Sequence, residues 1–148
     1  MKAELDEKLV KKYPLIFKDR FEDMRTTAMC WGFSCGDGWY DLIDSLCSTI
    51  QGHIDNSKKY GNSEIPQVVA TQVKEKYGTL RFYYYGGDEY VSGAVMLAEL
   101  MSSRICEVCG KPGRTRPGGW IRTLCDQHAE EMNYTLDYIE EEDYDEDN

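Results

Sequence analysis

The chain is poor in histidine, with only His53 and His128 among 148 residues. It also lacks an apolar run of the roughly eighteen residues that a membrane-spanning helix needs. Its charged beginning, residues 1–8, has no apolar core of the kind that signal peptides carry. We therefore expect a cytoplasmic protein with no membrane association. In a reducing compartment its six cysteines would be thiols or metal ligands rather than disulfides.

Basic residues are absent after Arg122, whereas eleven acidic residues follow it. Residues 1–122 hold all 17 Lys and Arg and 16 Asp and Glu, so the net charge of −10 belongs to the C-terminal end. An anionic ligand is therefore not excluded by the overall acidity. Residues 140–148 are almost entirely acidic, and we expect a disordered tail there.

Helical periodicity is clearest after Gly38, where apolar residues follow the spacing of one helix face. A shorter helix should end near Lys12, because Pro14 disfavours helical backbone in the residue before it. A further helix is expected over residues 89–104. Residues 56–66 are polar and typical of a turn. The apolar stripe consists of Trp39, Leu42, Ile43, Leu46, Cys47, Ile50 and Ile54.

A β-hairpin is indicated by residues 67–77 and 79–85, which are rich in Val, Thr, Phe and Tyr and reverse at Gly78. Because side chains alternate along a strand, Leu80, Phe82 and Tyr84 share one face, and Arg81, Tyr83 and Tyr85 share the other. The second face would suit a stacked base or a phosphate. A core with both faces covered is an equal alternative. The fold class is α+β: helices packed on a small antiparallel, hairpin-based sheet.

Two close pairs of metal-ligating residues stand in the C-terminal third, as C-x2-C and C-x2-H separated by fifteen residues. This spacing predicts a closed, structural Zn²⁺ site rather than a catalytic one, which would keep a position open for water. Thiols without metal are the alternative. A nuclease with a second metal would need more ligands, and only His53 remains. The predicted ligands are Cys106, Cys109, Cys125 and His128.

The order of elements around these ligands resembles a treble-clef zinc module. A knuckle at residues 106–110 is followed by a Pro-Gly-Gly loop, a short strand at 120–123 and a helix beginning near Ala129. We therefore expect an α+β body over residues 1–104 and a zinc module over residues 105–139, packed on the body.

The rest of the chain offers a contact surface of aromatic and cationic residues. It combines the segment from Trp31 to Trp39 with the hairpin, and its chemistry suits a small anionic ligand or a host protein. Cys30 and Cys35 are expected to be buried thiols, and Gly36 to Gly38 a helix-capping turn. The predicted ligand-binding residues are Trp31, Trp39, Lys74, Lys76, Arg81, Tyr83 and Tyr85. No catalytic residue is predicted.

Basic residues of the zinc module allow a second interpretation, nucleic-acid binding. They could equally bind the acidic tail of the same chain. These residues are Arg104, Lys111, Arg114, Arg116 and Arg122.

Three motifs resemble those of small uncharacterised proteins encoded by phages and prophages: residues 36–39 (GDGW), 73–83 (VKEKYGTLRFY), and 105–113 (ICEVCGKPG) with 125–128 (CDQH). The resemblance covers roughly residues 14–130. It implies an accessory phage product in the bacterial cytoplasm, of a kind that binds host proteins or nucleotide signals of antiviral defence. The leading hypothesis is a non-enzymatic, zinc-stabilised binding protein; a nucleic-acid-binding protein and a metal-dependent phosphoester hydrolase are the alternatives.

Overall fold

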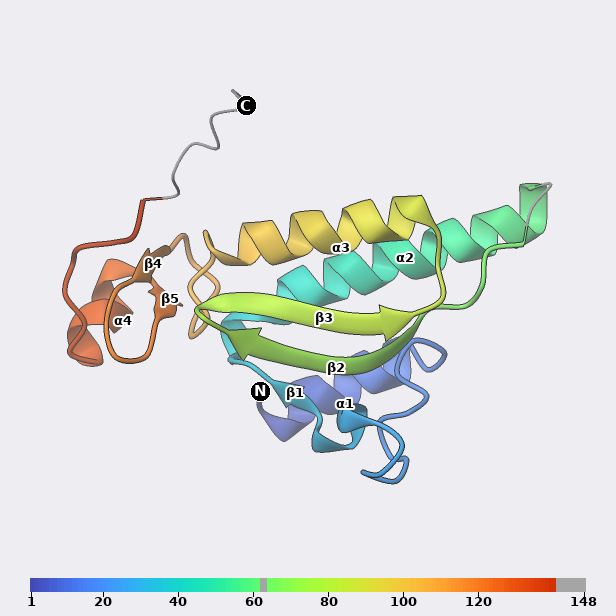
Figure 1. The fold of residues 1–148 in the computed structure, drawn as a ribbon, viewed down its shortest axis with the longest axis horizontal. Coiled ribbons are helices and arrows are strands. Elements are labelled where there is room, and N and C mark those ends of the chain that lie inside the picture. The colour runs from blue at the N-terminus through green and yellow to red at the C-terminus, as the bar shows by residue number, and fades with distance from the viewer. Residues whose placement is uncertain (62–63, 141–148) are drawn as a thin grey trace.

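The computed structural model describes residues 1–61 and 64–140 and confirms the expected α+β fold (Figure 1). The acidic tail from residue 141 lies outside the described residues. No helix in the described part is both long and apolar enough to cross a membrane. The elements are α1 (Ala3–Lys12), β1 (Phe33–Ser34), α2 (Tyr40–Tyr60), β2 (Val69–Lys76), β3 (Thr79–Tyr85), α3 (Glu89–Ser102), β4 (Arg114–Arg116), β5 (Arg122–Leu124) and α4 (Asp126–Glu131), with 3-10 turns at Ala28–Trp31 and Asp37–Trp39.

Helix α2 buries the apolar stripe that the sequence predicts. Ile43, Leu46, Cys47, Ile50 and Ile54 are all buried in the main core. The helix continues through residue 56, where a turn was expected, and ends at residue 60. Two lysines in its last turn favour this extension, because cations stabilise the C-terminal end of a helix dipole.

The sheet has the order β1-β2-β3 and contains the predicted hairpin. Strand β1 was not predicted; it pairs in parallel with β2. Two residues in a glycine-rich segment carry no periodic signal, so only the tertiary structure reveals this strand. Phe33, Val73 and Phe82 form one buried row across the three strands. This inner face packs with α2 and α3 in a single core.

Strand β3 is an edge strand, and α3 lies along it (Figure 1). The Leu80 N–H donates to Ser102 Oγ at 2.8 Å, and the Phe82 N–H donates to Glu99 Oε1 at 3.0 Å. Side chains of α3 therefore satisfy backbone donors that a second strand would otherwise pair with. Blocking an edge in this way limits edge-to-edge association.

His53 had no partner identifiable in the sequence, but the structure provides one. Its Nε2 lies 2.8 Å from Asp88 Oδ2, and its ring stacks on Tyr90 with centroids 3.9 Å apart. Asp88 also caps α3, because its Oδ1 accepts the Val91 N–H. The contact thus joins α2 to the first turn of α3. The hydrogen bond from His53 lowers the pKa of Asp88.

We expect Asp88→Ala to cost about 1 kcal/mol of stability, because it removes a helix cap. Asp88→Asn should keep most of the stability that the cap contributes, because an asparagine side chain can also cap a helix. The lowered pKa means that ionised Asp88 stabilises the fold above its ordinary pKa of about 3.9 and that this contribution disappears as the pH falls through the lowered value. Urea unfolding from pH 7 to pH 2 measures both effects. If the difference in unfolding free energy between wild type and Asp88→Asn does not shrink in acid, the proposed contribution of ionised Asp88 is wrong.

Candidate functional site

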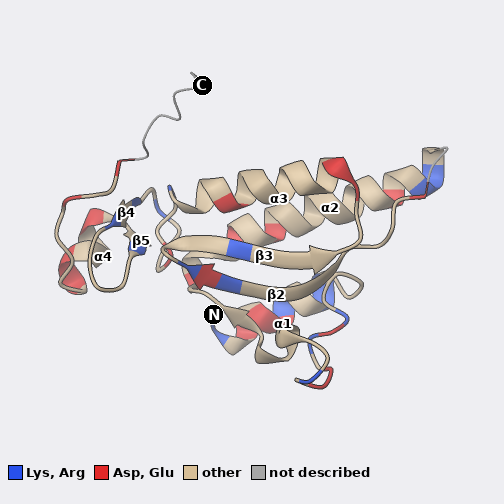
Figure 2. Cartoon of the chain, in the orientation of Figure 1, with Lys and Arg blue, Asp and Glu red and all other residues tan. Residues whose placement is uncertain are grey.

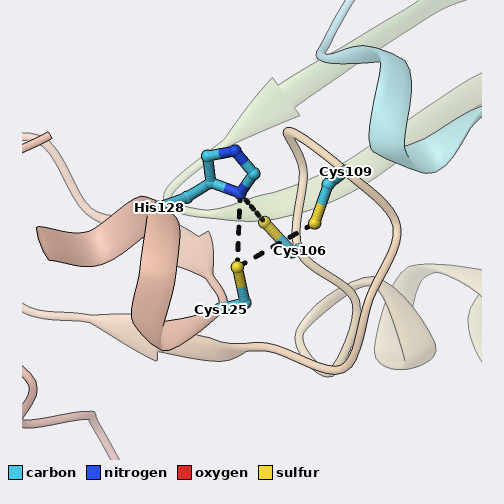
Figure 3. A group of neighbouring side chains, drawn as sticks. All are labelled: Cys106, Cys109, Cys125 and His128. Carbon is cyan, nitrogen blue, oxygen red and sulfur yellow. Dashed lines mark hydrogen bonds between the residues drawn. The ribbon is translucent and has the colours of Figure 1, made fainter. Parts of the chain in front are cut away.

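The four predicted metal ligands come together in the C-terminal part of the fold (Figure 3). Cys106 and Cys109 lie in the turn that follows α3, Cys125 precedes α4, and His128 lies in α4. The three Sγ atoms and one imidazole nitrogen are all within 4.8 Å of one another. These four side chains are close enough to hold a metal ion.

Individual distances show that the ligand atoms converge on one point. His128 Nδ1 lies 3.2 Å from Cys125 Sγ and 3.7 Å from Cys106 Sγ, and the Cys109 and Cys125 sulfurs are 3.9 Å apart. The other imidazole nitrogen, Nε2, lies 3.7 Å from a carboxylate oxygen of Glu131. A carboxylate behind a ligating histidine helps to orient the ring.

Backbone amides hydrogen-bond the sulfurs of Cys106 and Cys109, but the pKa values of the two thiols shift in opposite directions. Burial opposes ionisation of Cys106, but amides of Cys125, Cys109 and Val108 hydrogen-bond its sulfur and lower its pKa. The pKa of Cys109 is raised by burial and by the neighbouring Cys106, despite an amide bond from Lys111. Neighbouring thiolates repel one another, and a metal ion bound between them would relieve that repulsion.

The Gly36–Trp39 segment packs against the knuckle (residues 106–110) that carries Cys106 and Cys109. The Gly38 N–H donates to the backbone oxygen of Glu107 at 2.7 Å, and the Gly36 N–H donates to its carboxylate at 3.0 Å. The Trp39 indole N–H donates to the Ile105 oxygen at 2.9 Å. This segment, expected to cap the following helix, instead forms a 3-10 turn without a side-chain cap and holds the knuckle against the body. Trp39 is 0% exposed, so its prediction as a ligand-binding residue is wrong.

Two glycines in this segment are required by the close approach of the two backbones. A Cβ on Gly38 would lie 2.1 Å from the Cys106 oxygen, and a Cβ on Gly36 would lie 2.3 Å from the Glu107 oxygen. Both neighbours are main-chain atoms of the knuckle, which cannot rotate away as a flexible side chain could. The contact therefore depends on the absence of side chains at these positions.

Two arginines of the expected basic patch are engaged within the protein. Arg116 is 2% exposed and donates to the backbone oxygens of Leu124 and Leu136 and to Asp126. Arg122 pairs with the buried Glu107 carboxylate at 2.9 Å. These two guanidinium groups hold the module together, whereas Arg104, Lys111 and Arg114 of the expected patch are exposed.

The outer face of the sheet carries most of the other predicted ligand-binding residues. Lys74 of β2 lies opposite Arg81 of β3 in the strand register, and the basic bands of the two strands lie side by side in Figure 2. Tyr83 and Tyr85 are 43% and 50% exposed, so the alternative with both faces covered does not hold among the described residues. Trp31 is 68% exposed but lies in the 3-10 turn before β1 rather than on the hairpin.

A groove of about 400 Å³ opens where the hairpin turn meets the loop between β4 and β5. It brings together the predicted Lys74 and Lys76 with Tyr77 and Trp120, which the prediction missed. The sequence feature that could have indicated Trp120 is its position directly after Pro-Gly-Gly, in an expected loop. The lining residues are Lys74, Glu75, Lys76, Tyr77, Gly118, Gly119, Trp120 and Ile121.

The remaining cysteines are outside the metal cluster. Cys35 is buried as expected, whereas Cys30 is only partly buried, and its Sγ donates to the Thr27 oxygen at 3.3 Å. Burial raises the pKa of the Cys35 thiol to about 12 and also raises that of Cys47. In the described residues, neither Cys30 nor Cys35 belongs to a group of three or more metal-ligating side chains.

No family model, curated protein or solved structure matches the chain. The function must therefore follow from the molecule's own chemistry: the Cys/His cluster, the cationic sheet face and the groove between the hairpin and the metal module.

We expect Gly38→Ala to destabilise the protein by about 2 kcal/mol or more, because its Cβ would overlap the knuckle backbone. Gly52→Ala is the matched control: it lies in α2 with nothing within 4 Å of the added Cβ and should stabilise the helix by roughly 0.5–1 kcal/mol. Urea unfolding of both variants gives the comparison. Equal stability changes of the same sign would show that the docking contact is dispensable.

Proposed function

We propose that the protein is a non-enzymatic binding protein, folded around one structural Zn²⁺, that binds a small anionic ligand of nucleotide type on the outer face of its sheet. The proposal rests on one observation: Lys74 of β2 lies directly opposite Arg81 of β3, on the sheet face that also carries exposed tyrosines. Neither cation has a carboxylate partner among the described residues, although the chain as a whole carries a net charge of −10.

Zinc fits the Cys/His cluster best. Tetrahedral Zn²⁺ with its usual bond lengths separates two sulfurs by about 3.8 Å and a sulfur from a nitrogen by about 3.6 Å. The observed distances of 3.9 Å between sulfurs, and of 3.7 Å and 3.2 Å from sulfur to nitrogen, lie close to these values. Thiolates favour zinc over magnesium or calcium. Because four protein ligands complete a tetrahedron, the ion would be structural and would hold no water for hydrolysis.

Purified protein should contain about one Zn²⁺ per chain. Cys109→Ser should lose the metal and the ordered structure of residues 105–139, because one of the four ligands is gone. Cys30→Ser, which removes a thiol outside the cluster, is the control and should keep both. Metal analysis with amide hydrogen exchange measures the two properties. Full metal content in Cys109→Ser would refute the ligand assignment.

The outer face suits an anion that carries an aromatic ring. Along β3, Arg81, Tyr83 and Tyr85 alternate with buried residues and point away from the core. Among the described residues, the Arg81 guanidinium donates to neutral oxygens, those of Thr79 and Leu80, and no carboxylate neutralises its charge. Cations beside exposed phenol rings can hold phosphate and stack a base.

The biological setting that we propose, an accessory phage protein acting on host defence, comes from the sequence resemblance alone. A host protein is the alternative partner for the same face. Mass spectrometry of small molecules released from protein purified out of bacteria distinguishes the two. A stoichiometric nucleotide supports the proposal; its absence, together with a co-purifying host protein that Lys74→Glu releases, would favour the alternative.

We expect Lys74→Glu and Arg81→Glu each to weaken binding of adenosine triphosphate by about tenfold or more, since each replaces an attraction by a repulsion. Binding should also fall with rising salt. Lys58→Glu, at the end of α2 and away from the face, should change little. Isothermal titration calorimetry with adenosine triphosphate and inorganic triphosphate measures this. If neither anion binds at low salt, the proposal is wrong.

A further inference from the structure

Tyr77 has an unfavourable position for an aromatic residue. It is the first residue of the hairpin turn, with φ of +52°, and is followed by Gly78 at +81°. A turn with two positive φ angles favours Asn-Gly or Asp-Gly, and a bulky side chain is unfavourable in left-handed backbone. The ring gains little burial in return, because Tyr77 is 71% exposed. Folding stability therefore does not explain a tyrosine here.

The turn is held in place by the metal module. Thr123 Oγ1 donates to the Gly78 oxygen at 2.6 Å, and the Glu75 carboxylate accepts the Gly78 N–H at 2.8 Å. A Cβ on Gly78 would lie 3.2 Å from the Ile121 side chain. The backbone that carries the Tyr77 ring is thus fixed on both sides. The Glu75 carboxylate is also partly satisfied, which reduces its repulsion of an anion in the groove.

Trp120 is exposed to a similar degree, at 67%. Its position is nevertheless fixed, because its backbone oxygen accepts the Tyr134 hydroxyl at 2.6 Å. The Tyr134 ring also lies under the preceding loop, 3.4 Å from a Cβ built on Gly118. A large apolar side chain on a positioned loop, left open to solvent, is typical of a contact residue rather than a core residue.

Tyr77 and Trp120 line the same groove from different elements, one from the hairpin turn and one from the loop between β4 and β5. Lys74 and Lys76 line it as well, and the Lys76 ammonium lies 5.6 Å from the Tyr77 ring centroid. The groove volume of about 400 Å³ falls within the range of small-molecule sites. Lys74 also belongs to the outer face of the sheet, so the groove continues that face.

We propose that this groove is the pocket for the planar ring of the ligand, with Tyr77 and Trp120 contacting the ring and Lys74 and Lys76 holding the adjacent phosphate. The ligand class is a nucleoside phosphate. This inference rests on the proposed function and adds to it a ring-specific site. One wall of the groove belongs to the metal module, so removing the metal should remove ring recognition.

The test uses full-length, metal-loaded protein, with calorimetry against the four common ribonucleoside 5′-monophosphates, ribose 5-phosphate and inorganic triphosphate. At least one nucleotide should bind more tightly than ribose 5-phosphate. Tyr77→Asn and Trp120→Ala should each weaken that nucleotide by about tenfold, since a stacked base contributes about this much. Inorganic triphosphate should bind these two variants as it binds the wild type.

Tyr77→Asn has a second readout that needs no ligand. Because asparagine tolerates the left-handed turn, this variant should raise Tm by a few degrees while losing nucleotide binding. The control is Tyr60→Asn, since Tyr60 is 74% exposed and also has the preceding lysine over its ring. It should change neither property. Phe21→Ala, at 82% exposed, is the corresponding control for Trp120→Ala.

Nucleotide binding that survives both Tyr77→Asn and Trp120→Ala would overturn the inference. If inorganic triphosphate still binds and still depends on Lys74, the proposed function stands without the ring pocket. If none of the four nucleotides binds better than ribose 5-phosphate at millimolar concentration, the ring pocket is likewise refuted. If nucleotides bind through Tyr77 and Trp120 but inorganic triphosphate does not bind, the pocket stands and the anion-binding face fails.

Discussion

The contacts of Glu107 connect the two parts of the molecule. Its backbone oxygen accepts the Gly38 N–H, its own N–H donates to the Thr123 oxygen, and its carboxylate accepts from both Gly36 and Arg122. The residue is 4% exposed, and burying a carboxylate is costly unless charge and hydrogen bonds compensate it. Here they do. Because Glu107 lies between Cys106 and Val108 in the knuckle, the metal ligands and the docking surface share one short piece of backbone.

This arrangement explains which features the sequence could predict. The α2 stripe and the alternation along β3 are local patterns, each set by the geometry of one element, and the Cys and His ligands form two close pairs with a recognisable spacing. The contact of Gly36 with Glu107 joins residues 71 positions apart, and no periodic pattern in the sequence predicts it. The same holds for His53 with Asp88, 35 positions apart. Trp39 shows the resulting error, since an aromatic beside glycines resembles a surface contact until its partner, the Ile105 carbonyl, is known.

The structure also distinguishes charged and aromatic residues that stabilise the fold from those with no evident structural role. Arg116 and Arg122 looked like surface cations, yet both compensate buried polar groups of the metal module. Lys74 and Arg81 have no carboxylate partner in the part of the chain that the structure describes, and Tyr77 and Trp120 expose large rings without a gain in burial. Natural proteins tend to retain locally unfavourable choices at functional sites. Their proximity on the hairpin and the adjoining loop is the reason to place the proposed ligand there.

The distribution of charge bears on the size of the ligand that we propose. A long nucleic acid that extended from the groove along the metal module would meet a surface on which Arg116 and Arg122 are engaged internally. Its last helix, α4, exposes Asp126, Glu130 and Glu131, and the chain beyond it is strongly acidic. Like charges repel a polyanion over about a Debye length, roughly 8 Å at physiological salt. A small anion that occupies only the groove and the adjoining face meets the cations of β2 and β3 without crossing that region, so the electrostatics favour a nucleotide over a polymer.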